Sequence, residues 1–301
     1  HIKVQRVVSQ ILREGYQPVV DNALWFADHG QAVCSRMVQM QVEGVVLIHP
    51  PRSFTKSHLN LLLNANIPVV GIGCEVPGIT RYMSDKEHGF HCLTTHLLEL
   101  GYRRLTLMIG HDSTLRKGTL SWHAAKAEAG FKRAIADFGS SAPVYSDVLI
   151  VHYGHQSPKI PPEKPFDNDT YCPGYSGMKE ILRRPVLPEV VLCSNDSWAM
   201  GAMRACTEAD VRVPRDMAIT GFEDDPQGRY GLLPITSFSH PVEKMVDHGM
   251  GVLMEAIRNG TPTPDRLHIF AGELFIRQSA PARRSKRASA RTGSLTTKSI
   301  S

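Results

Sequence analysis

Three clusters of hydrogen-bonding side chains stand at the borders of apolar runs or helical stretches. The Ser-Asn-Asp tripeptide 194–196 and the Glu-Asp-Asp tripeptide 223–225 follow apolar runs, and Met-Ser-Asp 83–85 precedes a helical stretch. Helix capping and turn formation account for roughly one residue in each cluster. The surplus carboxylates and amides suit the hydroxyls of a sugar or a sugar acid. The clusters therefore predict a binding site for a small polar molecule.

Motifs for catalysis, for a cofactor or for a metal are not found in the sequence. The stretch VVGIGCEV at 69–76 lacks the third glycine of a dinucleotide fingerprint, and Pro77 and Gly78 continue a loop where a helix should begin. Of the histidines at 88, 91 and 96, only the first two share a helix face, which indicates a solvated surface rather than a metal site. No nucleophile and base stand at a catalytic spacing. We therefore expect no enzyme activity, no cofactor and no metal.

The clusters sit in a regular alternation of strand-like and helix-like segments, which favours βαβ units and an α/β fold with mostly parallel sheets. In such sheets the ligand crevice lies at the carboxyl ends of the strands. The spacing predicts helices over 86–100, with Asp85 as N-cap, and over 241–259. Residues 152–175, rich in proline, tyrosine and histidine, are expected to form a long loop. The predicted strands are 19–20, 45–48, 69–72, 105–109, 144–151, 190–193, 217–221 and 235–238.

Composition sets the broad class of the chain. Its 301 residues suffice for two domains or for one large domain, and 42% hydrophobic with 21% charged residues fits a globular protein. No uninterrupted apolar stretch is long enough to span a membrane, and the first residues lack the pattern of a leader peptide. Six scattered cysteines favour a reducing cytoplasm. The net charge of +5 resides in the tail 281–301, which has six basic residues and no acid and is expected to be disordered.

Several segments resemble, in order and spacing, the effector-binding core of LacI/GalR-family transcription regulators. They are VEGVVLI (42–48), IPVVGIG (67–73), DKEHGFHCLTTHLLELGYRRLTLMIG (85–110), AGFKRAI (129–135), PEVVLCSNDSWAMGAMRACTEADVRVPRDMAITGFEDD (188–225) and FIRQS (275–279). The wording DMAITGF is similar to the gluconate-repressor branch. The resemblance implies two Rossmann-like lobes of the periplasmic-binding-protein type, with the ligand in the cleft between them. It also implies a homodimer that binds operator DNA through helix-turn-helix heads.

Matching segments place 1–110 with 241–264 in an amino-side lobe and 111–240 with 265–280 in a carboxyl-side lobe. Compared with the family, the chain lacks the helix-turn-helix head and the first strand of the amino-side lobe. We therefore expect a truncated chain, or one with a misplaced start, that as written does not bind an operator specifically. Where the family usually has a ligand-gripping arginine, this chain has Ala127. The substitutes left open are Lys126, His123 and Arg116. In the 152–175 loop, only Phe166 and Tyr171 are nominal candidates for an aromatic over the ligand.

The resulting hypothesis is the effector-binding and dimerisation core of a cytoplasmic repressor that senses a small sugar or sugar acid. The predicted contacts lie on both sides of the cleft: Asn195, Asp196, Glu223 and Asp224 on one side, Asp85 on the other, Lys126 against an acidic ligand, and Trp122 either stacked on a ring or packed in the core. A solute-binding protein of a sugar transporter is the alternative of the same fold. An α/β enzyme is the third class considered.

Overall fold

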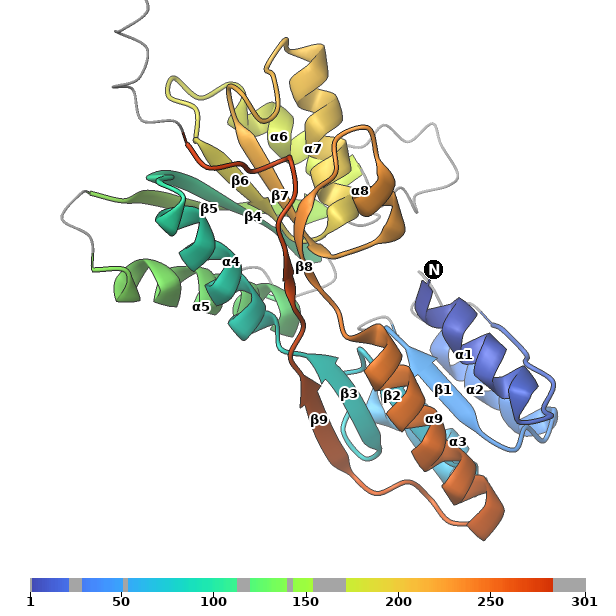
Figure 1. The fold of residues 1–301 in the computed structure, drawn as a ribbon. Helices are drawn as coiled ribbons and strands as arrows, with labels where there is room; N and C mark the ends of the chain where they lie inside the picture. The colour runs from blue at the N-terminus through green and yellow to red at the C-terminus, as the bar shows by residue number, and fades with distance from the viewer. Residues whose placement is uncertain are drawn as a thin grey trace, which may run out of the picture.

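The computed structural model of the chain describes residues 2–21, 29–50, 54–112, 120–139, 143–153 and 172–283. These residues form two α/β lobes, each built on its own sheet, and the described chain crosses between the lobes three times (Figure 1). None of the helices in these ranges is long and apolar enough to cross a membrane. The predicted α/β fold with mostly parallel sheets is confirmed.

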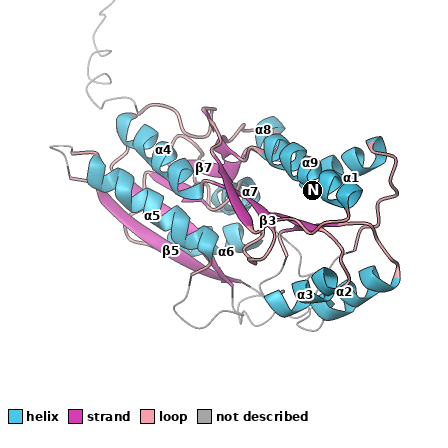
Figure 2. Ribbon diagram, turned by 90° about the horizontal axis from the view of Figure 1, so that it is seen from below, coloured by secondary structure: helices cyan, strands magenta, loops and turns pink. Residues whose placement is uncertain are grey.

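The first lobe contains a parallel sheet in the order β1-β2-β3-β9. Helices α1 and α9 cover one face of this sheet, and α2 and α3 pack together on the other (Figures 1 and 2). The strands are β1 (Val45–Ile48), β2 (Val69–Ile72), β3 (Thr80–Ser84) and β9 (Arg266–Phe270). The helices are α1 (Ile2–Arg13), α2 (His29–Gln39), α3 (Lys56–Asn64) and α9 (Val242–Asn259).

The second lobe contains a six-stranded sheet in the order β10-β8-β7-β6-β4-β5, parallel except for β10. Helices α4 and α5 pack side by side on one face, and α6 and α7 pack on the other (Figure 2). The strands are β4 (Arg104–Asp112), β5 (Tyr145–Tyr153), β6 (Val190–Cys193), β7 (Ala218–Glu223), β8 (Thr236–Ser239) and β10 (Leu274–Phe275). The helices are α4 (Lys86–Glu99), α5 (Trp122–Asp137), α6 (Cys172–Ile181), α7 (Asp196–Glu208) and α8 (Pro226–Tyr230).

Strand β6 shows why its sequence forms a central strand. Side chains alternate across a strand, so Val190 and Leu192 enter the core under α4 and α5, while Val191 and Cys193 enter the core under α6 and α7. All four are fully buried. A continuous apolar run is what a parallel strand covered by helices on both faces requires.

The two predicted helices form close to the predicted bounds. Asp85 caps α4, its carboxylate accepting from the backbone N–H of His88 at 2.9 Å. Helix α9 ends at Gly260, whose φ of 62° gives the left-handed C-cap that glycine favours.

The lobe boundaries differ from those expected at 110 and 264. Helix α4 packs on α5 and β4 joins the second sheet, so the first crossing comes near residue 85. Strand β9 pairs with β3, so residues 266–270 belong to the first lobe. The expected boundaries come from segments that match the family, and the sheet pairings move them to about 85 and 270. The strands β3, β9 and β10 carry polar or exposed residues, so the hydrophobic pattern does not predict them.

Other expectations need smaller corrections. Val19 and Val20 form no strand and are 50% and 67% exposed, and they have no sheet partner among the described residues. The expected loop 152–175 begins inside β5 and ends inside α6, and its residues 154–171 lie outside the described ranges. The expected tail is anchored at its start, where Tyr102 donates a hydrogen bond to the carbonyl of Pro281 at 2.7 Å, and residues 284–301 lie outside the described ranges.

The third crossing segment contacts each of the other two, and the three together form the hinge between the lobes. The backbone N–H of Asp85 donates to Phe270 O at 2.9 Å, and that of Ser239 donates to Glu273 O at 2.7 Å. Gly272 lies so close to the neighbouring segment that a Cβ atom there would sit 1.9 Å from Ser239 O. Glycine is therefore required where the second and third crossings meet.

Candidate functional site

Six titratable side chains from both lobes and the hinge come together where the carboxyl ends of strands meet the first turns of helices. We call this group the interlobe cluster. Its members are Lys3, His49, Lys86, His123, Glu223 and His240. The carboxyl ends of β1 and β7 supply His49 and Glu223, and the cluster therefore occupies the position at which open α/β sheets bind ligands.

The first lobe contributes a lysine and histidine pair. Lys3, in the first turn of α1, is 2% exposed, and its Nζ lies 2.5 Å from Nε2 of His49. His49 follows β1 with a φ of 44°, a conformation that few non-glycine residues adopt. The His49 ring centroid lies 6.2 Å from that of His123 on α5, so this pair faces the second lobe directly.

The second lobe contributes a carboxylate held at the hinge. Glu223 ends β7 with a φ of 102°, and its Oε1 lies 3.1 Å from Nε2 of His240. The Glu223 side chain is 21% exposed, while that of His240 is 4% exposed. His240 immediately precedes α9, so this contact joins the second lobe to the segment that returns to the first.

Lys86 is the first residue of α4 and is 7% exposed. Its Nζ lies 5.0 Å from the centroid of the Phe222 ring. Among the described residues, no carboxylate lies within ion-pair distance of Lys86 or of Lys3. In the described part of the chain, two lysine side chains are therefore buried with no direct acidic partner.

Burial decides the protonation of the cluster. It lowers the pKa of Lys3 and of Lys86, although Glu223 opposes both shifts. It holds the pKa of His49 and of His123 well below the usual 6.5, and it lowers the pKa of His240 to about 4. Burial alone would raise the pKa of Glu223, but His240, Lys3 and Lys86 hold it well below the usual 4.5. At neutral pH the carboxylate is charged and the three imidazoles are neutral.

The family described as "Periplasmic binding protein-like domain" matches residues 94–280, more than half of the chain. The chain belongs to this family.

Curated relatives place it further within the periplasmic-binding-protein-like proteins. The transcriptional repressor PurR of Glaesserella parasuis is 25% identical over 286 residues, which cover 92% of this chain and 76% of that protein. The transcriptional regulator MalR of Streptomyces coelicolor is 26% identical over 294 residues, covering 93% and 78%. A solved LacI-family regulator from Enterococcus faecalis with bound ribose shares the fold, with a TM-score of 0.73 at 16% identity over 94% of both chains. The shared part is the effector-binding core of the LacI family.

Within this LacI-family core, two of the predicted contact residues serve as helix caps. Asp85 caps α4, and Asn195 caps α7 by accepting from the backbone N–H of Trp198 at 2.8 Å. The amide NH₂ of Asn195 makes no hydrogen bond to another described residue. A ligand contact by this NH₂ group stays a prediction.

Asp196 and Asp224 are buried in internal bonds. Asp196 is 1% exposed, and its Oδ2 accepts from the backbone N–H of Asp225 at 2.6 Å. Asp224 forms ion pairs with Arg229 at 2.7 Å and with Arg277 at 2.6 Å. The ion pairs account for both oxygens of Asp224, whereas Oδ1 of Asp196 is buried without a hydrogen-bond partner among the described residues.

The remaining predictions fall on and around α5. Lys126 pairs with Glu87 of α4 at 2.9 Å and is 42% exposed. Trp122, the first residue of α5, packs edge-on against His123 with ring centroids 5.1 Å apart. Of the three substitutes for the family arginine, His123 is the one in the interlobe cluster, and Arg116 lies outside the described residues, as do Phe166 and Tyr171.

Sequence reasoning missed Lys3, His49, Lys86 and His240. One usable signal was the place of the lysines: the positive end of the helix dipole disfavours a cation in the first turn, yet α1 and α4 each have a lysine there. A lysine in the first turn does not stabilise the helix, so its presence there indicates another role. The burial and the cross-lobe contacts of the histidines depend on the tertiary fold and left no pattern in the sequence.

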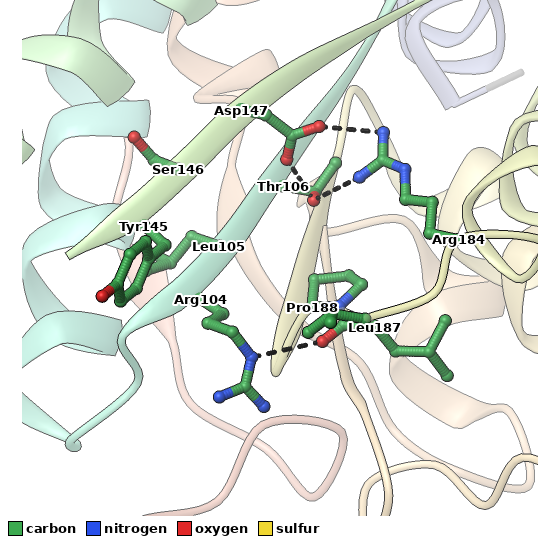
Figure 3. A pocket seen from close by; sticks show the side chains of 10 residues that line it. Arg104, Leu105, Thr106, Tyr145, Ser146, Asp147, Arg184, Leu187 and Pro188 are labelled. Atoms are coloured by element: carbon green, nitrogen blue, oxygen red, sulfur yellow. Dashed lines mark hydrogen bonds and ion pairs between the residues drawn. The ribbon is translucent and has the colours of Figure 1, made fainter.

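A separate shallow cavity of about 410 Å³ lies at the opposite, amino-terminal ends of β4 and β5 (Figure 3). There Asp147 accepts a hydrogen bond from Thr106 at 2.5 Å and pairs with Arg184 at 2.8 Å. Thr106, Asp147 and Arg184 therefore bond to one another within this cavity. Ligands of α/β sheets bind at the other end of the strands, so this cavity is not the candidate site.

Proposed function

We propose that this chain is the effector-binding and dimerisation core of a transcriptional repressor that senses a small sugar or sugar acid. In this proposal the repressor works in the cytoplasm as a homodimer and binds operator DNA through helix-turn-helix heads. The proposal assigns no catalytic step to the site. It rests on one observation above all: the interlobe cluster joins polar groups from two lobes that are connected only by hinge segments in the described chain.

The relatives support the regulatory part of the proposal. Two of them, named as a repressor and a regulator, align with more than nine-tenths of this chain at 25% and 26% identity. The alignments therefore extend across both lobes rather than one sheet.

The proposed ligand contacts follow from the groups at the strand ends. Glu223 is ionised and partly exposed, so its free carboxylate oxygen accepts hydrogen bonds from ligand hydroxyls. The amide NH₂ of Asn195 donates to a ligand oxygen. Trp122 contacts His123 of the interlobe cluster, and Lys126 lies about one helical turn after His123 on α5.

The switch in this proposal is closure of the two lobes. A ligand held by Glu223 of the second lobe and by Lys3 or His49 of the first lobe binds the closed state better than the open one. It shifts the equilibrium only by that difference in affinity. A shift from 1:99 to 99:1 requires a difference of about 10⁴-fold, which several hydrogen bonds across the cleft can supply.

A thermal-shift screen of neutral sugars and sugar acids tests ligand binding. Glu223→Gln is the site variant, because it keeps the shape and the backbone while it removes the charge. Glu243→Gln on α9, where the side chain is 79% exposed, is the matched control. We expect a ligand to raise the Tm of the wild type and of the control, and to raise that of Glu223→Gln by much less. Equal shifts in all three proteins would refute the cleft assignment.

A reporter assay tests regulation. The chain is joined to the helix-turn-helix head of a LacI-family repressor, and transcription from the matching operator is measured. We expect repression that changes when the stabilising ligand is added. A chimera that folds and binds the ligand but neither represses nor responds would refute the regulatory role.

A further inference from the structure

Two lysines without a direct acidic partner are an unusual feature of a buried site. Lys3 is 2% exposed and Lys86 is 7% exposed, and among the described residues neither has a carboxylate within 4.0 Å. Burying an ammonium group costs several kcal/mol unless an anion or hydrogen bonds compensate. Both lysines also stand in the first turn of a helix, where the helix dipole adds a further repulsion.

The acids near the cluster do not neutralise these lysines at contact distance. Glu223 is bonded to His240. Asp225, which precedes α8, raises the pKa of Lys3 through a longer-range electrostatic interaction and not through a direct contact. The groups from the other elements, His49 of the β1 end and His123 of α5, are bases. Among the described residues, the β1 end and α5 therefore contribute bases to the surroundings of the two lysines, and the acids come from the β7 end and the residues that follow it.

The cluster also has unused hydrogen-bonding atoms. The Nδ1 atoms of His123 and His240 are buried and have no hydrogen-bond partner among the described residues. Buried polar atoms in folded proteins are nearly always paired. A bound molecule that supplies oxygen or hydroxyl groups would satisfy them together with the lysines.

We infer that the effector is an anion, and that its carboxylate or phosphoryl group pairs with Lys86 of the second lobe and Lys3 of the first. This inference rests on the proposed function and narrows its ligand class to acids or phosphate esters of polyols, excluding neutral sugars. One anionic group held by a lysine from each lobe bridges the cleft. Glu223 then binds a hydroxyl of the same molecule, because a second anion beside it would be repelled.

Matched pairs of probes separate charge from shape. Gluconate is compared with sorbitol, which has the same carbon chain and no carboxylate, and glucose 6-phosphate is compared with glucose. Inorganic phosphate and acetate are included as the bare anions. Binding is measured by thermal shift and by titration calorimetry. We expect the anionic member of at least one pair to raise Tm and the neutral members to have no effect, and the pair that responds identifies carboxylate or phosphoryl.

Lys86→Met and Lys3→Met remove the charge and keep most of the side-chain volume, and Lys244→Met at an exposed position of α9 is the matched control. Loss of a charge-assisted contact weakens binding of the anion by roughly tenfold to a hundredfold. Without ligand, Tm of Lys86→Met is expected to equal or exceed that of the wild type, since an apolar group replaces a buried unpaired charge. If Lys86 had only a structural role, Lys86→Met would lower Tm without ligand and would leave binding of the anion unchanged.

Two outcomes would overturn the inference. In the first, a neutral sugar stabilises the wild type as well as its anionic counterpart does, and Lys86→Met binds it normally; the proposed effector-binding role then survives without the anion. In the second, no anion in the panel, inorganic phosphate and acetate included, raises Tm. Failure of the proposed function gives a different result, namely lysine-dependent anion binding with no response in the reporter assay.

Discussion

Replacing Asp224 with alanine separates a structural role from a ligand-binding role for this residue. The sequence pattern predicts a ligand contact, because Asp224 follows a strand beside Glu223. In the structure its side chain is 4% exposed and pairs with Arg277 at 2.6 Å and with Arg229 at 2.7 Å. We expect Asp224→Ala to destabilise the fold strongly, with no ligand involved.

The magnitude follows from what each arginine loses. Arg277 is 15% exposed, and breaking a buried pair by removing one partner costs about 3–5 kcal/mol because the other charge stays buried. Arg229 is 42% exposed, so solvent screens its pair and its loss adds at most about 1 kcal/mol. For a domain of this size, about 1 kcal/mol moves Tm by roughly 2–4 °C. The expected decrease in Tm is therefore roughly 6–24 °C.

The assay is thermal unfolding followed by circular dichroism, with urea unfolding as a second measure. Asp216→Ala is the matched control: Asp216 pairs with Arg212 at 2.7 Å on the surface, and we expect its loss to leave Tm near that of the wild type. A decrease below about 3 °C for Asp224→Ala, combined with loss of effector binding, would refute the structural assignment and restore the ligand contact.

Three further predictions concern pH, the hinge and the dimer. Burial raises the pKa of Asp196 to about 8, so its protonated form stabilises the fold fully below about pH 4, and this contribution is lost as pH rises through 8. Urea unfolding should show that the free energy of unfolding falls less between pH 5 and pH 8 in Asp196→Asn than in the wild type. An equal fall in both proteins would contradict this. Gly272→Ala places a Cβ 1.9 Å from Ser239 O and should lower stability by about 1–3 kcal/mol, whereas Gly251→Ala, with open space around it, should not; equal Tm values for the two would be contrary evidence. Leu232 is fully exposed beside α8, so Leu232→Asp should convert the proposed dimer to a folded monomer in light scattering, and a persistent dimer would exclude this surface.

Much of the fold could be predicted because its central strands are buried on both faces. The runs 69–72 and 190–193 are apolar throughout and coincide with the buried central strands β2 and β6. The apolar run 45–48 coincides with β1, which is partly buried at one edge of the described sheet. Strand β9 carries no such signal: it has the sequence RLHIF with exposed residues, and it pairs with β3 across nearly two hundred residues of chain. Such a pairing is fixed by the return of the chain through the hinge, which local periodicity does not encode.

The site could be predicted only in part. Glu223 was identified because it ends a strand, and the structure places it in the interlobe cluster. Asp85 and Asn195 stand at strand ends as well, but the carboxylate of Asp85 and the amide oxygen of Asn195 cap helices. Position at a strand end therefore does not distinguish a helix cap from a ligand contact. The two lysines were missed because each reads as an ordinary helix-surface residue until the two lobes are brought together.

The chemistry of the cluster differs from what the polar tripeptides suggest. Those tripeptides are rich in acids and amides, which suit the hydroxyls of a sugar or a sugar acid. In the folded chain Asp196 and Asp224 are buried in internal bonds, and the surplus charge near Glu223 is that of Lys3 and Lys86. Because Asp196 and Asp224 are engaged in internal bonds, the groups available to bind a ligand are mainly hydrogen-bond donors and cations. The charge of the site is therefore a property of the tertiary structure, and it favours an anionic effector where the tripeptides suit a neutral sugar and a sugar acid equally.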